Sequence, residues 1–404
     1  MIDWNSLRKW QKEAYEKWVE NNLKGLCVAT TGTGKSVFGL FCIQKCRVST
    51  IIIVPTTVIM NQWKSEVLKH LDVSEDNVGL YYGDEKNLRP ITIAIINSVR
   101  KKDLSMFRMC VMDEVHKFAS EENIKPIKGA SPEFEYTLGL TATLKRKDER
   151  HKLIKKSIGE VFYNYDVEMA KKDGVVSNYI IKNISVPLTV KERGDYDSAH
   201  EYIIDNYQKF GSFEAIKNNC GKYWTEEGRI ASTLMRSMSK RRKTFCNAEY
   251  KKDVTLELVK KHSEEQIIVF CEFVDFANEL NTHIQSAGYK SGIFHSKKKD
   301  MNTIKKFSEG ELDVLVSVKS LNEGLDVKGA SVGIIVAGNK EPRDLKQRLG
   351  RILRSDEGKE KAILYQLYAE NTKEYEDARR RTFFLQNSAD LVNWDNFEEY
   401  CHFT

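Results

Sequence analysis

Short, continuous apolar runs alternate with helix-like stretches along most of the 404 residues. Runs such as Ile51–Val54 and Met109–Met112 place apolar side chains at consecutive positions rather than at every second one. This pattern is typical of strands that are buried on both faces, as in parallel sheets covered by helices. We therefore predict an α/β fold. The expected strands are 25–29, 50–54, 78–82, 91–95, 109–112 and 136–140 in the first half, and 266–271, 291–294, 314–318, 332–336 and 362–367 in the second.

The two sets of strands predict two tandem parallel-sheet domains, residues 1–165 and 166–404, as the length also suggests. The region from about Gly194 to Lys261 has few strand-like runs. We expect it to be a mainly helical insert between the halves or on the second. The earlier segment Tyr179–Val190 contains Pro187, which favours an edge strand of the second domain.

The net charge of +6 permits nucleic-acid binding but does not require it. Basic clusters at Lys240–Lys243, Lys297–Lys299 and Arg379–Arg381 are as typical of solvated surfaces. No apolar run approaches the length needed to span a bilayer, and no secretion signal is present. The eight cysteines form no zinc-binding pattern. We expect no membrane association and a cytoplasmic location, in a bacterial or phage-infected cell.

Ala29–Ser36, with the sequence ATTGTGKS, joins a predicted strand to an apolar helix. Glycines allow backbone N–H groups to face a phosphate, and the helix N-terminus adds partial positive charge. A lysine can reach the outer phosphates, and a hydroxyl can bind magnesium. The segment therefore predicts a triphosphate-binding loop, although Ala29 stands where the usual pattern has glycine. The expected contacts are Thr31, Gly32, Thr33, Gly34, Lys35 and Ser36.

Asp113 and Glu114 directly follow the apolar run Met109–Met112. A carboxylate at the end of a strand can hold Mg²⁺, usually through water. A second carboxylate beside it can orient and deprotonate an attacking water. We predict that Asp113 and Ser36 bind the metal, that Glu114 activates water, and that Lys35 stabilises the transferred phosphate.

Two further groups complete the predicted nucleotide site. Arg8 and Gln11 lie upstream of the loop, and a glutamine amide can read an adenine edge because it both donates and accepts. Gln347, Arg351 and Arg354 fall at i, i+4 and i+7, on one face of a helix. An arginine from a second domain can stabilise charge on a γ-phosphate. The alternative is a basic surface helix.

Taken in order, these motifs resemble those of superfamily 2 helicases and translocases, from about Trp4 to Arg381. Asp113–His116 resembles their Asp-Glu-x-His box, and Thr141–Thr143 resembles their third motif. Within the superfamily, the chain is most similar to the XPB and phage UvsW branch. The other matching segments are Val54–Thr57 with Gln62-Trp63, Asn97-Ser98, Val269–Phe273 and Ser317–Val327.

The resemblance implies two RecA-like lobes with ATP in the cleft between them. It also implies nucleic acid across both lobes on the opposite edge, held mainly by its phosphates. By position, Thr56, Gln62, Asn97, Ser98, Ser317 and Ser320 would contact nucleic acid, His116, Thr141 and Thr143 would couple the ATP state to that contact, and Gly324 and Asp326 would bind nucleotide and link both sites.

We therefore expect an ATP- and Mg²⁺-dependent DNA helicase or translocase, acting as a monomer on single-stranded, forked or branched DNA. An RNA helicase and the motor subunit of a restriction or defence complex are the alternatives. The core begins almost at the first residue, so a junction-recognising element is expected elsewhere. The helical insert, with Lys240–Lys243 and Trp224, is the candidate for this element. The alternative is that the insert has a purely structural role.

Overall fold

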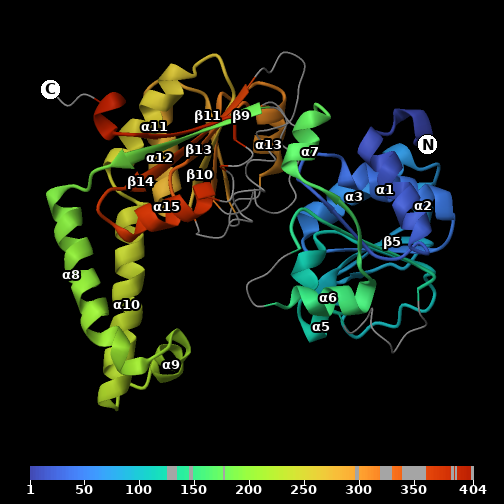
Figure 1. Ribbon diagram of the computed structural model, residues 1–404, viewed down its shortest axis with the longest axis horizontal. Coiled ribbons are helices and arrows are strands. Elements are labelled where there is room, and N and C mark those ends of the chain that lie inside the picture. Colours follow the sequence, from blue (N-terminus) through green and yellow to red (C-terminus); the bar gives the residue numbers. More distant parts are fainter. Residues whose placement is uncertain are drawn as a thin grey trace. The chain divides into compact units, whose positions relative to one another are not determined.

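The computed structural model describes residues 1–124, 134–144, 149–175, 178–295, 300–318, 330–338, 361–383, 386 and 389–401. Contacts divide the chain into a first compact unit formed mainly by Met1–Ser177 and a second unit that begins at Asn178. Each unit is a sheet with helices packed on it (Figure 1). The predicted fold class, two parallel-sheet α/β domains with a helical insert, is confirmed. The predicted boundary between residues 165 and 166 stays a prediction.

Unit 1 contains a sheet with the strand order β4-β3-β5-β2-β6-β7-β1-β8. All neighbouring strands are parallel except β3 and β4, which form a short antiparallel pair. Every strand predicted in this half is present, whereas the edge strands β4 and β8 were missed because they are short or only partly buried. The strands are β1 (Leu26–Ala29), β2 (Thr50–Val54), β3 (Val78–Tyr82), β4 (Glu85–Lys86), β5 (Ile91–Ile95), β6 (Met109–Met112), β7 (Tyr136–Thr141) and β8 (Val161–Tyr165).

Helices cover both faces of this sheet, with α1, α2 and α3 on one side and α5 and α6 on the other (Figure 1). Because strands β5, β2, β6, β7 and β1 run in the same direction, their carboxyl ends meet at one edge of the sheet. In such sheets, ligands bind at this edge. The helices are α1 (Lys9–Glu20), α2 (Lys35–Cys46), α3 (Thr57–His70), α4 (Ile96–Val99), α5 (Glu121–Ile124), α6 (His151–Ile158) and α7 (Val167–Lys172).

Unit 2 contains a parallel sheet with the order β11-β12-β10-β13-β14-β9-β15. The predicted edge position of β9 is wrong, because β9 lies between β14 and β15 and pairs with both. Pro187 follows the end of the strand and therefore blocks no ladder bond. The strands are β9 (Asn178–Val186), β10 (Ile267–Cys271), β11 (Ser291–His295), β12 (Val314–Val318), β13 (Val332–Ile335), β14 (Lys361–Ala369) and β15 (Leu391–Asp395).

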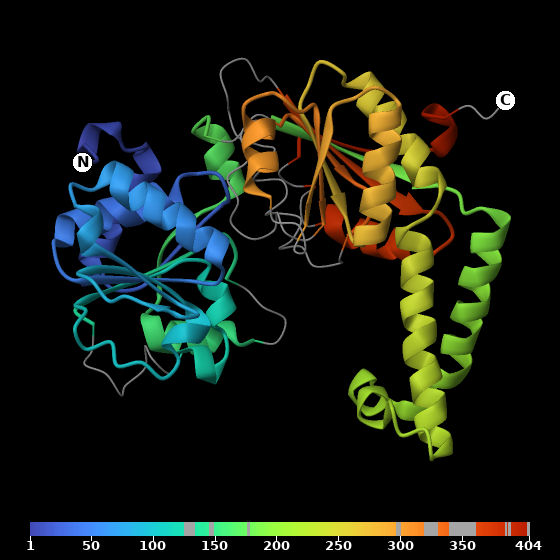
Figure 2. The same ribbon diagram turned by 180° about the vertical axis from the view of Figure 1, so that it is seen from behind.

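The region predicted as a helical insert divides into two parts. Helices α8 (Val190–Tyr207) and α10 (Glu226–Cys246) pack side by side, and α9 (Phe213–Asn219) lies at their far end (Figure 2). We call residues 190–246 the arm. Helix α11 (Tyr250–Lys261) instead packs on the sheet of unit 2 beside α12 (Val274–Ser286), so it belongs to the core. Within the described part of the chain, no helix is long and apolar enough to cross a membrane.

A buried polar network joins α11, the end of β13 and helix α15 (Lys373–Phe383). The ammonium of Lys251 lies 2.7 Å from the carboxylate of Glu374 and donates to the carbonyl of Val336 at 2.8 Å. Arg381, further along α15, donates to the side chain of Gln366 at 2.9 Å and to the carbonyl of Gly338 at 3.1 Å. Since each buried charge has specific partners, the network fixes how the two helices sit on the sheet.

Replacement of Lys251 by methionine should destabilise unit 2. The substitution leaves the Glu374 carboxylate buried without its cation, and breaking such a pair costs about 3–5 kcal/mol. Lys252→Met is the matched control, because its partners Glu249 and Glu279 are exposed and such pairs contribute about 1 kcal/mol or less. Urea unfolding, with hydrogen exchange in β14 to assign the transition, measures both. Equal losses in the two variants would contradict this account.

Candidate nucleotide and nucleic-acid sites

The predicted phosphate loop follows β1 and leads into α2. Gly32 and Gly34 have φ angles of +84° and +92°, in the left-handed region that side chains disfavour. Gly34 is also the residue that precedes α2, and a Cβ on it would lie 3.0 Å from the amide nitrogen of Gln11. Both glycines are therefore required by the backbone geometry of the loop.

Three residues of the N-terminal segment hold this loop by hydrogen bonds to its carbonyl groups. Arg8 and Trp10 donate to the carbonyl of Thr33 at 2.9 and 3.1 Å, and the Gln11 side chain donates to the carbonyl of Gly34 at 2.9 Å. The Gln11 oxygen accepts from the backbone N–H of Arg8 at 2.8 Å. One hydrogen and one lone pair of the Gln11 amide remain for a ligand, so its predicted adenine contact stays a prediction.

The loop borders a cavity of about 240 Å³ at the carboxyl edge of the sheet. Lys35 lies at its wall, where the ammonium donates to the carbonyls of Ala29 and Thr30 at 3.0 and 3.2 Å. The cavity brings together most of the residues predicted to bind nucleotide and metal. Its lining consists of Arg8, Thr31, Gly32, Gly34, Lys35, Ser36, Val37, Ile59, Gln62, Trp63, Glu66, Asp113 and Glu114.

Asp113 and Glu114 stand across the cavity from the loop. One Asp113 oxygen accepts from the indole N–H of Trp63 at 2.9 Å, and the other accepts from the backbone N–H of Glu114 at 2.8 Å. Burial raises the pKa of Asp113 to about 6, and the neighbouring Glu114 adds to this, whereas Trp63 and Lys35 lower it. A divalent cation would offset this repulsion between adjacent carboxylates, so the donor set of Ser36, Asp113 and water fits Mg²⁺.

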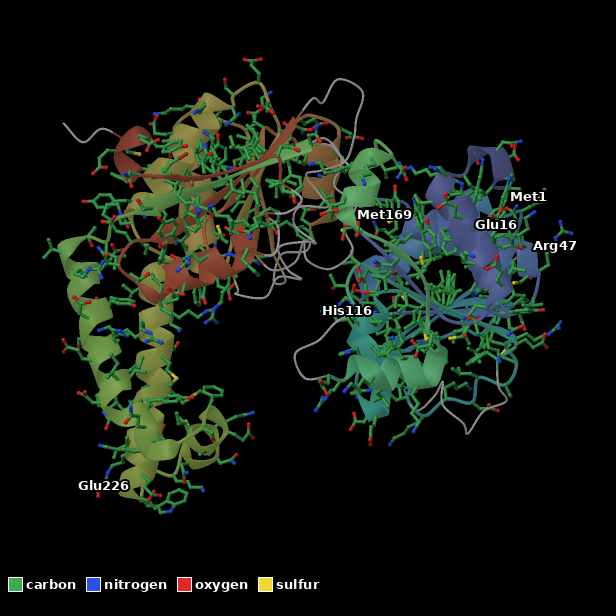
Figure 3. All side chains as sticks on the ribbon, in the orientation of Figure 1. Met1, Glu16, Arg47, His116, Met169 and Glu226 are labelled. Atoms are coloured by element: carbon green, nitrogen blue, oxygen red, sulfur yellow. The ribbon has the colours of Figure 1, made fainter. Side chains whose placement is uncertain are left out.

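Glu114 also contacts one of the residues that were predicted to couple the two sites. It has a φ of +49°, and its carboxylate lies 3.3 Å from Nδ1 of the fully buried His116, which is labelled in Figure 3. The same nitrogen lies 3.0 Å from the Thr141 hydroxyl. Since that hydroxyl donates to the carbonyl of Thr143, it accepts from His116, which places a proton on Nδ1. The Thr141 hydroxyl therefore links His116 to Thr143 by hydrogen bonds, and Glu114 contacts the same imidazole nitrogen.

Helix α3 contributes a face to the cavity that sequence reasoning did not assign to nucleotide. Ile59, Gln62, Trp63 and Glu66 occupy positions i, i+3, i+4 and i+7 and all line the cavity. This spacing was the available signal, but it also describes ordinary packing. Gln62 was predicted to contact nucleic acid and instead lines the nucleotide cavity in this structure.

The other predicted nucleic-acid contacts of unit 1 lie at neighbouring strand ends. Thr56 follows β2 and precedes α3, and the exposed Asn97 and half-buried Ser98 follow β5. Because β2 and β5 are adjacent, these side chains share the carboxyl edge with the cavity, displaced along it. The expectation that nucleic acid lies across both lobes, on the edge opposite the ATP cleft, stays a prediction.

In unit 2, Ser317 is 1% exposed inside β12, where it is in register with Phe270 and Phe294. This position does not support its predicted contact with nucleic acid, because Ser317 lies inside β12, which continues to Val318, and its side chain is covered. The remaining predictions lie outside the described residues. They are Ser320, Gly324, Asp326, Gln347, Arg351, Arg354 and the cluster Lys297–Lys299.

Two family models match the chain, "Type III restriction enzyme, res subunit" over residues 5–146 and "Helicase conserved C-terminal domain" over residues 250–356. The chain is 31% identical to the DNA 3'-5' translocase XPB2 of Sulfurisphaera tokodaii over 93% of its own length and 84% of that protein. It is 28% identical to the DNA 3'-5' helicase XPB of Kineococcus radiotolerans, over 94% of its own length and 63% of the relative.

Among solved structures, S. cerevisiae Dbp5 bound to RNA and ADP BeF3 matches with a TM-score of 0.66 and 14% identity, covering 97% of this chain and 90% of that one. At this identity the match shows the fold alone. The two family models and these relatives assign the chain to the superfamily 2 helicases, a class of ATP-hydrolysing enzymes. Within that class, the chain belongs to the XPB family, as its identity to the Sulfurisphaera relative shows.

Replacement of Thr141 by valine should slow ATP hydrolysis by about 10- to 100-fold, because misplaced catalytic groups typically cost that much. The variant removes the hydroxyl that fixes His116 and, through it, Glu114. Thr137→Val on the same strand is the control, since that hydroxyl donates to the carbonyl of Ile158 and neither residue lines the cavity. Turnover and ATP affinity are measured separately, and unchanged turnover in Thr141→Val would exclude this coupling.

Proposed function

We propose that this protein is an ATP-dependent DNA helicase or translocase that unwinds or remodels duplex, forked or branched DNA. The observation that carries the proposal is the convergence of Lys35, Asp113 and Glu114 on one cavity, beside Thr56 and Asn97 on the same sheet edge. The relatives support DNA as the substrate, since they are named DNA 3'-5' translocases and helicases. The 3'-5' polarity and the action on branched DNA are finer parts of the same proposal.

The residues of the cavity divide the work of ATP hydrolysis. Backbone N–H groups of the loop and Lys35 would bind the outer phosphates. Arg8 and Gln11 hold the loop in shape, and their contact with the base is part of the proposal. Glu114 orients and deprotonates the attacking water. Mg²⁺, held by Ser36 and Asp113, would neutralise phosphate charge when bound. Arg351 and Arg354 would complete the site from the second lobe.

Nucleic acid would be held mainly by its phosphates in unit 1. Thr56, Asn97 and Ser98 offer hydroxyl and amide groups, which bind phosphate without reading base sequence. They follow β2 and β5, and β2 is the neighbour of β6, which Asp113 follows. A strand bound there would contact the same sheet edge that carries the nucleotide cavity, and this proximity supports mechanical coupling between the two ligands.

The arm is our candidate for the element that engages a fork or junction. Lys240 pairs with Asp195 at 2.7 Å and Arg241 contacts His200, so both join the two long helices of the arm. Arg242 pairs with Glu272 at 3.0 Å and connects the arm to the sheet of unit 2, so these basic side chains already have structural partners. Substrate contact is therefore assigned to the far end, where α10 begins at Glu226 (Figure 3). Tyr223 and Trp224 are exposed there, by 59% and 78%.

Replacement of both Tyr223 and Trp224 by alanine should weaken binding to forked DNA, because each stacked base contributes about 1–3 kcal/mol. Val190→Ala is a control at the other end of the arm, where the side chain is 94% exposed. Fluorescence anisotropy with a labelled fork measures the affinity. An unchanged affinity in the double variant would assign the arm a purely structural role.

Three variants test the nucleotide site. Lys35→Ala should abolish ATP turnover and weaken ATP binding, because the charge that contacts the phosphates is lost. Glu114→Gln should keep ATP binding and lose turnover by about 100-fold or more, as expected for a removed general base. Arg351→Ala should lose turnover while the fold is intact. Strand-displacement and ATPase assays measure the outcome, and normal DNA-stimulated turnover in all three would refute the proposed site.

An RNA helicase is an alternative that the nucleotide site alone does not separate from this proposal. The motor subunit of a restriction complex is favoured by one observation, the description of the family model that matches residues 5–146. A chain that hydrolyses ATP on duplex DNA but displaces no strand by itself would support that second candidate.

A further inference from the structure

Trp63 lies between the elements of unit 1 that would bind the two ligands. It sits in the second turn of α3, is only 2% exposed, and lines the nucleotide cavity. Its indole N–H donates to a carboxylate oxygen of Asp113 at 2.9 Å. A buried hydrogen bond to a carboxylate is both strong and directional, so the position of the indole constrains that of the carboxylate.

The ring of Trp63 is also fixed from the side of the phosphate loop. A Cβ on Gly39, in the middle of α2, would lie 2.9 Å from Cη2 of Trp63 and 3.2 Å from a methyl group of Leu140. Glycine is unfavourable inside a helix, and here it makes room for the ring. Trp63 therefore packs directly against the helix that begins at Lys35, next to the strand that ends at Thr141.

The same helix reaches the predicted nucleic-acid edge. Thr56 caps the N-terminus of α3, where its hydroxyl accepts from the backbone N–H of Ile59 at 3.4 Å. A phosphate that bound this hydroxyl and the first N–H groups of α3 would act on the helix as a whole. Because a helix is stiff over two turns, a shift at Thr56 would be carried to Trp63.

We propose that Trp63 is a positioning residue that links strand engagement at the N-terminus of α3 to the carboxylate of Asp113. The inference deepens the proposed function and rests on it. Trp63 touches neither DNA nor the reacting phosphate in this account. It makes the affinity for DNA depend on the nucleotide, and by thermodynamic linkage the reverse.

The test uses the full chain with Trp63→Phe, which keeps an aromatic ring and removes the N–H group. The affinity for a labelled single-stranded DNA is measured with and without the analogue AMP-PNP and Mg²⁺. The ratio of the two dissociation constants is the coupling factor. We expect this factor to fall toward 1 in Trp63→Phe, because the variant removes the coupling free energy that is carried through α3.

Two controls separate the hydrogen bond from packing. Trp18→Phe removes an equally buried indole N–H, which donates to the carbonyl of Thr137 away from the cavity, and should keep the wild-type coupling factor. The double variant Trp63→Phe with Gly39→Ala refills space beside the smaller ring and guards against unfolding of the single variant. It should melt no lower than Trp63→Phe and should show the same reduced coupling factor.

The outcomes are distinguishable. A wild-type coupling factor in Trp63→Phe, or recovery of coupling by Gly39→Ala in the double variant, would overturn the inference, because the N–H group would then be dispensable. Wild-type protein that binds DNA without any response to AMP-PNP would also overturn it. Wild-type protein that binds no DNA and hydrolyses no ATP would instead remove the proposed function on which it rests.

Discussion

The direction of the strands in unit 1 is the constraint on which the site depends. Since β5, β2, β6, β7 and β1 are parallel neighbours, every segment that follows a strand emerges at the same edge. Residues that are far apart in the sequence, such as Thr56, Asp113 and Thr141, are therefore brought together without long loops. Helix α2 then points its N-terminus at that edge, where it can stabilise an anion.

Side-chain contacts connect the residues that follow different strands. One set of contacts runs from Glu114 through His116 to Thr141 and Thr143, and another runs from Asp113 to Trp63. Both begin at the adjacent carboxylates that follow β6. The hydrolytic residues are thus tied both to the third motif and to α3, which gives a physical route by which a bound strand and a bound nucleotide can affect each other.

Much of the fold could be predicted from the sequence because fully buried strands leave continuous apolar runs. β2 and β6 carry that signal along their whole length, and their bounds were correct. β15 was missed because Asn393 and Asp395 interrupt its pattern. β9 was wrongly placed at the edge because Pro187 favoured that position, whereas β15 pairs with its outer side. Partner strands far away in the sequence decide which strand is the outermost, and local residues do not carry this information.

The candidate site was predicted where backbone chemistry demands particular residues. The glycines, Lys35 and the Asp113–Glu114 pair have few other uses in that order, and the structure places them around one cavity. Roles that depend on side-chain direction were harder to predict. Ser317 is buried because β12 extends past it, and Gln62 lines the cavity because of the rotation of α3 about its axis. Packing sets both the end of the strand and the rotation of the helix.

Steady-state ATP hydrolysis without nucleic acid, and with single-stranded DNA, forked or four-way DNA, and RNA, tests the central claim most directly. The account predicts low turnover without nucleic acid and strong stimulation by DNA, with the largest effect from branched DNA. Stimulation by RNA alone would contradict the assignment to DNA. The same low rate with every nucleic acid would contradict the claim that this chain by itself couples the two sites.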